Sequence, residues 1–212
     1  MTKVQVCGLR TLEDAIICEK AGVDSLGFVN VEGRERSISL EKTKEIIDGV
    51  GPMILTALIG FPKNADDIIK KADFVGADAV QTYTLGIGEL EKVRDHGFRV
   101  YRALSIDIGT GNLEVPIEGL SSFAEVSDII VFEPSLKKVV GGLGLSYDYG
   151  CIISPYKKYC GRFGVAGGLN PQNVGEALKI EPYSVDVSSG VEAKLGEKSE
   201  EKVIEFIKRC KN

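Results

Sequence analysis

Two short runs of small residues near the C-terminal end of the chain could bind an anion through their backbone. Gly167 and Gly168 follow the apolar segment RFGVA, and Ser188, Ser189 and Gly190 follow the apolar segment YSVDV. Glycine and serine leave backbone N–H groups accessible, and several such groups can converge on one phosphate. Either run alone is a weak signal, but two such runs lying side by side would form a phosphate-binding cup.

The two runs can meet only if the apolar segments before them are neighbouring strands. Along the chain, short apolar runs alternate with helical stretches through eight units, and no change in composition marks a linker. Continuous apolar runs are typical of strands buried on both faces, and strict alternation predicts a parallel sheet with right-handed crossovers. Eight units in 212 residues favour one (β/α)8 TIM barrel spanning residues 1–212 over an open doubly wound sheet.

In such a barrel, binding and catalytic residues gather where the strands end. The predicted strand ends are, in chain order, Cys7-Gly8, Phe28-Val29, Gly60-Phe61, Thr82-Tyr83, Ser105-Ile106, Glu133-Pro134, Ala166-Gly167-Gly168 and Ser188-Ser189-Gly190. The last two sets lie where barrels of this kind commonly bind phosphate. The fold prediction therefore brings the two small-residue runs together and places a set of reactive side chains beside them.

Composition argues against several kinds of partner. The formal net charge is −5 and no basic run is longer than two residues, so we expect no nucleic-acid or anionic membrane surface. No apolar run approaches the ~20 residues of a membrane helix, and we expect no signal peptide. Five cysteines without C-x-x-C spacing suit a reducing cytoplasm better than a disulfide framework or a metal site. His96 is the only histidine, which excludes a mechanism with two imidazoles.

Several motifs resemble phosphoribosylanthranilate isomerase of tryptophan biosynthesis, nearly end to end and in the same order. They are VCGLRTLEDA (6–15), GVDSLGFV (22–29), RSIS (36–39), GGLG (141–144), YDY (147–149), AGGLNPQNV (166–174) and PYSVDVSSGVE (182–192). This family is a small barrel of the ribulose-phosphate-binding type that performs an Amadori rearrangement without a cofactor. The resemblance implies isomerisation of N-(5-phosphoribosyl)anthranilate to 1-(2-carboxyphenylamino)-1-deoxyribulose 5-phosphate.

The implied reaction needs a general acid at the ribose ring oxygen and a general base at C2′. Cys7 matches the family's base, which must be a thiolate of lowered pKa; the alternative is a small buried cysteine of the core. Arg36 matches the arginine that binds the anthranilate carboxylate, and its neighbour Arg34 could share or replace that role. Asp186 is expected to organise the phosphate loops through hydrogen bonds. The remaining substrate-binding candidates are Gly142, Gly144, Gly167, Gly168, Ser188, Ser189 and Gly190.

The sequence departs from the family pattern at three positions. Glu133 stands where the family has an aspartate as general acid, Tyr83 stands in place of a histidine, and Leu145 stands in place of a lysine. These departures leave a second interpretation, a paralogous barrel that acts on another phosphosugar or binds a phosphorylated ligand without turning it over. The retained Cys7 and Arg36 favour the enzyme, because a binding protein has no use for a thiol base.

Glu133 is the predicted general acid. An apolar rim of Phe132, Leu143 and Leu145 would raise its pKa by desolvation and keep a proton available near neutral pH. Asp148 or a water molecule is the alternative proton donor. We expect a small phosphorylated substrate as the partner, without nucleic acid, membrane, cofactor or metal, and the sequence is compatible with an oligomer.

Overall fold

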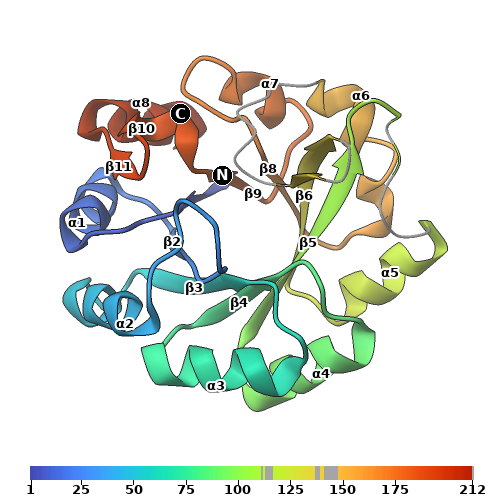
Figure 1. Ribbon diagram of the computed structural model, residues 1–212. Coiled ribbons are helices and arrows are strands. Elements are labelled where there is room, and N and C mark those ends of the chain that lie inside the picture. The colour runs from blue at the N-terminus through green and yellow to red at the C-terminus, as the bar shows by residue number, and fades with distance from the viewer. Residues whose placement is uncertain (111, 113–116, 137–138, 141–147, 212) are drawn as a thin grey trace.

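The computed structural model describes residues 1–110, 112, 117–136, 139–140 and 148–211, within which eight parallel strands close into a barrel (Figure 1). The barrel strands are β1 (Lys3–Cys7), β2 (Ser25–Val29), β3 (Leu55–Gly60), β4 (Ala79–Thr82), β5 (Arg99–Asp107), β6 (Ile129–Leu136), β8 (Phe163–Ala166) and β9 (Ser184–Val187). Each strand pairs in parallel with the next, and β9 pairs with β1 to complete the ring. The predicted (β/α)8 barrel is confirmed.

Helices surround the barrel on its outside, as Figure 1 shows. They are α1 (Leu12–Ala21), α2 (Leu40–Gly49), α3 (Ala65–Val75), α4 (Ile87–His96), α5 (Ile117–Glu125), α6 (Tyr149–Ile153), α7 (Val174–Leu178) and α8 (Glu200–Lys211). Thr11 caps α1 and Ser39 caps α2, because their side chains accept hydrogen bonds from Asp14 N and Lys42 N. None of the described helices is long and apolar enough to cross a membrane.

The strand residues divide between an outer and an inner layer, because successive side chains of a strand point to opposite faces. Outward residues such as Val4, Val6 and Phe28 pack with the helices in the main hydrophobic core. The inner layer contains a cluster of small side chains, among them Ala57, Ala79, Ala103 and Ala166. These small residues leave space in the interior for longer polar side chains.

Two hairpins were not predicted from the sequence. The short strand β7 (Val139–Val140) runs antiparallel to the end of β6. Between β9 and α8 the chain forms a 3₁₀ turn, η2 (Ser189–Val191), and an antiparallel hairpin of β10 (Glu192–Lys194) and β11 (Glu197–Lys198). A second 3₁₀ turn, η1 (Lys157–Tyr159), follows α6. The chain between the last barrel strand and the last helix is therefore structured and not a plain turn.

An aspartate just before each of three strands accepts a hydrogen bond from the backbone near the start of the preceding strand. Asp24 Oδ2 accepts from Val4 N at 2.9 Å, Asp78 Oδ2 from Thr56 N at 2.8 Å, and Asp128 Oδ2 from Val100 N at 2.8 Å. In each case the carboxylate satisfies a backbone donor at the start of the preceding strand. A charged acceptor makes such a bond stronger than one between neutral groups.

We predict that Asp128→Ala lowers the free energy of unfolding by about 1–2 kcal/mol, because Val100 N at the start of buried β5 loses its acceptor. Urea denaturation followed by far-ultraviolet circular dichroism measures the change. Asp95→Ala is the matched control, since Asp95 is exposed on α4 and contacts only Arg94 at 3.9 Å among its described ion pairs. The control should stay within about 0.5 kcal/mol of the parent. Equal losses in both variants would show that the aspartate bond adds nothing.

Candidate active site

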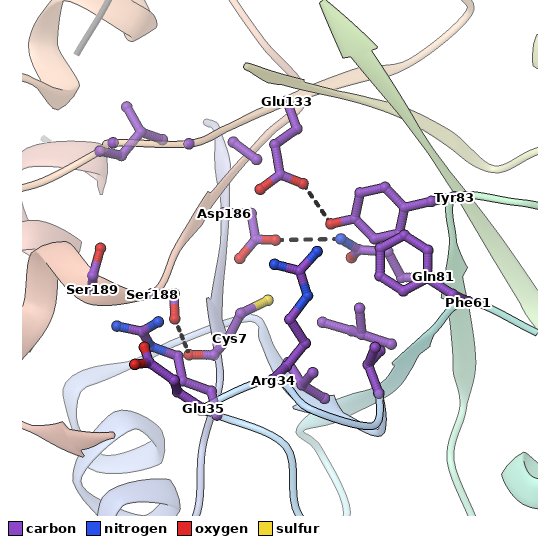
Figure 2. Close-up of a pocket in the computed structure, with 18 of the residues that line it drawn as sticks. Cys7, Arg34, Glu35, Phe61, Gln81, Tyr83, Glu133, Asp186, Ser188 and Ser189 are labelled. Atoms are coloured by element: carbon purple, nitrogen blue, oxygen red, sulfur yellow. Dashed lines mark hydrogen bonds between the residues drawn. The ribbon is translucent and has the colours of Figure 1, made fainter. Parts of the chain in front are cut away.

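A pocket of about 290 Å³ opens where the carboxyl ends of the barrel strands meet (Figure 2). The predicted site residues that line it are Cys7, Arg36, Glu133, Gly167, Gly168, Asp186, Ser188 and Ser189. Gly190 follows Ser189 in the same loop, whereas Gly142 and Gly144 lie outside the described residues. Residues from both ends of the chain thus share one pocket.

The two small-residue loops touch each other at one side of the pocket. Gly167 and Gly168 both adopt left-handed backbone, with φ of +83° and +65°. A side-chain carbon at Gly190 would lie only 1.8 Å from the carbonyl oxygen of Leu169, so the second loop packs directly on the first. Asn173 holds the first loop, because its Nδ2 donates to Gly168 O at 2.8 Å. The geometry brings together the two runs that sequence analysis expected to meet.

A polar layer lies at the floor of the pocket, beneath the rim. Gln5 Nε2 lies 3.1 Å from Cys7 Sγ, 2.8 Å from Gln81 Oε1 and 3.3 Å from Asp186 Oδ2, and Gln81 Nε2 lies 3.5 Å from the same Asp186 oxygen. Ser25 Oγ donates to Gln5 Oε1 at 3.0 Å, which fixes the direction of that amide. Sequence analysis missed both glutamines. The available signal was a glutamine inside each of the apolar runs KVQVC and DAVQTY.

Asp186 lies in the last barrel strand, as expected, but its hydrogen-bond partners differ from the prediction. Its described hydrogen bonds join it to the Cys7 thiol and to the amide groups of Gln5 and Gln81, and not to the phosphate loops. The reason is its position within β9, two residues before the rim residue Ser188. Figure 2 shows its carboxylate between Cys7 and Glu133.

The thiol of Cys7 differs from the expected thiolate. Burial raises its pKa well above the ordinary value, and the nearby Asp186 carboxylate raises it further, while the amide of Gln5 and the charge of Lys198 act in the opposite direction. Burial likewise raises the pKa of Asp186. The expectation of a lowered thiol pKa is therefore wrong, because burial of the thiol and the carboxylate beside the sulfur both raise it.

Glu133 has the property expected of a general acid. Burial raises its pKa to about 7, and Asp186 adds to the rise, whereas a hydrogen bond from Tyr83 and the charge of Arg34 oppose it. Phe132 does not form an apolar rim here, because it faces the outer layer and packs near Tyr156 and Phe163. Leu143 and Leu145 lie outside the described residues. The direction of the predicted shift is confirmed, but Phe132 does not cause it.

Arg36 belongs to a buried ion network that sequence analysis did not foresee. Its Nε and Nη2 donate to the two oxygens of Glu192 at 2.7 and 2.8 Å. Lys198, whose side chain is fully buried, donates to Glu192 Oε1 at 3.2 Å, to Cys7 O at 2.7 Å and to Ser188 O at 3.1 Å. Burial lowers the pKa of Lys198, against the effect of Glu192. Burial opposes ionisation of Glu192, but Arg36 and Lys198 together lower its pKa.

Two further side chains bear on the site predictions. Arg34 extends into the pocket (Figure 2), and its guanidinium lies 5.9 Å from the ring centre of Phe61. Asp148, the alternative proton donor, caps α6 by accepting from Cys151 N at 2.9 Å and is not among the described residues that line the pocket. Arg34 therefore remains a candidate for binding the substrate carboxylate, and the structure does not support Asp148 as the proton donor.

This constellation defines an enzyme class. A closed (β/α)8 barrel carries, at one pocket, a carboxyl group that titrates near neutral pH, a buried thiol beside a carboxylate, and cationic side chains next to two loops that expose backbone N–H groups. No group of metal-ligating side chains occurs among the described residues. Such a site is suited to proton transfer on a small anionic substrate.

Comparisons with known proteins identify the family. The family model for N-(5′phosphoribosyl)anthranilate (PRA) isomerase matches residues 4–209. The N-(5′-phosphoribosyl)anthranilate isomerase of Rubrobacter xylanophilus is 30% identical over 100% of both chains, and that of Geotalea uraniireducens is 35% identical over 100% of this chain and 99% of the other. The chain belongs to the N-(5′-phosphoribosyl)anthranilate isomerase family.

Solved structures agree with this assignment. The crystal structure of phosphoribosyl anthranilate isomerase from Thermotoga maritima superposes with a TM-score of 0.87 at 30% identity, over 100% of this chain and 99% of that one. Another phosphoribosyl anthranilate isomerase, in complex with reduced 1-(o-carboxyphenylamino)-1-deoxyribulose 5-phosphate, gives a TM-score of 0.84 at 28% identity, with the same coverage.

We predict that Gly190→Ala weakens binding of inorganic phosphate about 10- to 100-fold, because a methyl group must displace the Leu169 carbonyl and with it the N–H groups of the first loop. Isothermal titration calorimetry with phosphate measures the loss. Gly175→Ala is the control, since nothing lies within 4 Å of a side-chain carbon at that position. Unchanged phosphate affinity in Gly190→Ala would place the anion elsewhere.

Proposed function

We propose that the pocket catalyses the isomerisation of N-(5′-phosphoribosyl)anthranilate to 1-(2-carboxyphenylamino)-1-deoxyribulose 5-phosphate in tryptophan biosynthesis. The observation that carries the proposal is Glu133, a buried carboxyl group with a pKa of about 7 that faces the same pocket as Cys7 and Asp186. The bound reduced 1-(o-carboxyphenylamino)-1-deoxyribulose 5-phosphate in a structural relative supports the choice of substrate. The Amadori rearrangement needs an acid and a base on one substrate, and this pocket supplies both.

Glu133 is the general acid of the first step. It transfers its proton to the ring oxygen of the ribose as the bond between that oxygen and C1′ breaks, and the nitrogen lone pair forms the Schiff base. A pKa of about 7 leaves a large fraction of the carboxyl group protonated at neutral pH. The same group is acidic enough to release the proton, which is the condition for efficient general acid catalysis.

Cys7 and Asp186 act together as the base of the second step. The two buried groups lie side by side, and burial raises the pKa of each, so the Asp186 carboxylate is a better proton acceptor than an exposed one. With the proton on Asp186, the Cys7 thiolate is free to take the proton from C2′. The electron pair of that C–H bond forms the C1′=C2′ double bond of an enolamine, which tautomerises to the aminoketone. Gln5 supports the thiolate by donating toward Sγ.

The two charged ends of the substrate have separate partners. The phosphate binds to backbone N–H groups of the loops at Gly167–Gly168 and Ser188–Gly190. The anthranilate carboxylate binds to Arg36, which lines the pocket and is held in place by its two hydrogen bonds to Glu192. Holding both ends supplies much of the acceleration, because it fixes C2′ and the ring oxygen relative to their catalytic groups.

The setting of the enzyme follows from its chemistry. The five cysteines are unpaired in the described structure, which suits a reducing compartment, and we place the enzyme in the cytoplasm. One solved structure is of monomers of the dimeric phosphoribosylanthranilate isomerase from Thermotoga maritima. Analytical ultracentrifugation of this chain would measure its oligomeric state.

We predict that the purified chain consumes phosphoribosylanthranilate, seen as loss of the substrate's fluorescence, and that turnover falls as pH rises through about 7 because Glu133 loses its proton. Glu133→Gln and Cys7→Ala should each lower kcat by about 10²- to 10⁴-fold while the fold is retained. Cys160→Ala, at a cysteine away from the pocket, is the control and should keep the parental rate. A parental rate in Glu133→Gln would remove Glu133 from the mechanism, and lack of turnover by the parent would refute the proposed function.

We predict that Arg36→Ala raises KM for the natural substrate about 10- to 100-fold with a smaller change in kcat, because a charge-assisted bond to the carboxylate is lost. A substrate analogue without the carboxylate should bind to the variant and the parent with equal affinity. Arg34→Ala is the comparison variant. A carboxylate-dependent loss in Arg34→Ala alone would transfer the role to Arg34, and thermal unfolding of both variants checks that the Glu192 network has not collapsed.

A further inference from the structure

A short hydrogen bond joins Tyr83 to Glu133 across the mouth of the barrel. Tyr83 Oη lies 2.5 Å from Glu133 Oε2, and Figure 2 marks this contact. Tyr83 follows directly after β4, whereas Glu133 lies in β6, and β5 runs between these strands. The two side chains therefore reach over the intervening strand to meet. This bond uses one carboxyl oxygen and leaves the other, Oε1, to face the pocket.

The ring of Tyr83 is held in place by its neighbours. Phe61 stacks on it with ring centres 4.7 Å apart and an angle of 14° between the planes. The guanidinium of Arg34 lies over the Phe61 ring, 5.9 Å from its centre. Rotation of the tyrosine would break the stack, and offset aromatic pairs of this kind stabilise a fixed geometry. The hydroxyl is therefore fixed where the carboxyl group needs a donor.

The direction of the hydrogen bond follows from the acidity of the two groups. Burial and the nearby charge of Glu133 raise the pKa of Tyr83 well above its ordinary value, so the phenol keeps its proton and donates. The other charged groups that shift the pKa of Glu133 are Asp186 from β9 and Arg34 from the loop after β2. Cys7, Glu35 and Arg36 line the same pocket. Ser105, opposite Glu133 in β5, is uncharged. Tyr83 is the described group that hydrogen-bonds to this carboxyl.

We propose that Tyr83 is the positioning residue of the general acid: its hydroxyl holds Glu133 Oε2, so that Oε1 carries the proton toward the substrate. This inference rests on the proposed function, because it assigns a partner to the acid of that reaction. It also gives a role to a position at which the sequence departs from its family.

The hydrogen bond tunes the acid as well as orienting it. A donor to a carboxyl group stabilises the ionised form, so Tyr83 opposes the rise in pKa that burial causes. Without the hydroxyl, Glu133 would hold its proton to higher pH and release it less readily. Tyr83 thus keeps the acid near neutrality in a pocket that is otherwise strongly desolvating.

The test is Tyr83→Phe, which removes the hydroxyl and keeps the stacked ring. Titration of the Glu133 carboxyl carbon by ¹³C NMR, assigned by its absence in Glu133→Gln, should show a pKa raised by roughly one unit. The alkaline limb of the kcat profile should move upward by the same amount. At pH values where both enzymes carry the proton, kcat should fall about 10-fold with KM nearly unchanged, because the acid is no longer oriented.

Two controls separate positioning from general damage. Tyr101→Phe removes a hydroxyl from another buried interior tyrosine that does not line this pocket, and it should change neither the pKa of Glu133 nor kcat. Adding Tyr83→Phe to Glu133→Gln should cause no further loss of turnover, since the hydroxyl acts through the carboxyl group.

The outcomes are distinct for this inference and for the proposed function. An unchanged Glu133 pKa in Tyr83→Phe, or full multiplication of the two losses in the double variant, overturns the role of Tyr83. Retained turnover in Glu133→Gln overturns the role of Glu133 instead. The NMR titration needs no substrate, so it reports on the Tyr83–Glu133 pair even if the substrate assignment fails.

Discussion

The hydrogen-bonded pairing of β1 with β9 is the constraint on which the site depends. It joins the first and last strands of the barrel in a register that sets Gln5 opposite Asp186 and Val6 opposite Val187. Cys7, one residue beyond that register, consequently lies beside the loop of Ser188, whose hydroxyl donates to Cys7 O at 3.1 Å. An open sheet with the same strands would separate the thiol from the carboxylate and from the phosphate loop. Closure of the ring is thus what assembles the base.

Burial in the closed barrel raises the pKa values of the pocket's acidic groups. The same desolvation raises the pKa of Cys7, Glu133 and Asp186, yet the functional result differs with each group's neighbours. Glu133 accepts a hydrogen bond from Tyr83 and its pKa stays near 7, while the Asp186 carboxylate beside the Cys7 thiol raises the thiol pKa further. The glutamines on the floor satisfy part of this buried polar set, which would otherwise be costly to remove from water. Small interior alanines make the necessary space.

The sequence predicted which residues lie at the carboxyl end of the barrel, because that depends on strand order. It did not predict side-chain burial or pKa shifts, because these depend on contacts between residues far apart in the chain. Strand–helix alternation was enough to place Cys7, Glu133 and the two small-residue loops at one end of a barrel. Phe132 was assigned to the pocket although it alternates with Glu133 along one strand and so faces the opposite layer. The predicted shift in the pKa of Cys7 has the wrong direction, because the direction depends on burial and on the nearby Asp186 carboxylate. Lys198 sits in a run of charged residues that looks solvent-exposed, and only its contact with the Cys7 carbonyl shows that it is buried.

The burial of Lys198 has a consequence for how the enzyme is made. Its ammonium group bonds to the carbonyls of Cys7 and Ser188, at the ends of the first and last barrel strands, and so completes the seam between them. During synthesis, β1 emerges from the ribosome long before β9 or the β10–β11 hairpin exists, and its free edge then lacks a partner on that side. The pocket can assemble only after β9 and the β10–β11 hairpin have left the ribosome, because they supply Asp186 and Lys198. Until then the unpaired edge of β1 is open to pairing with other chains.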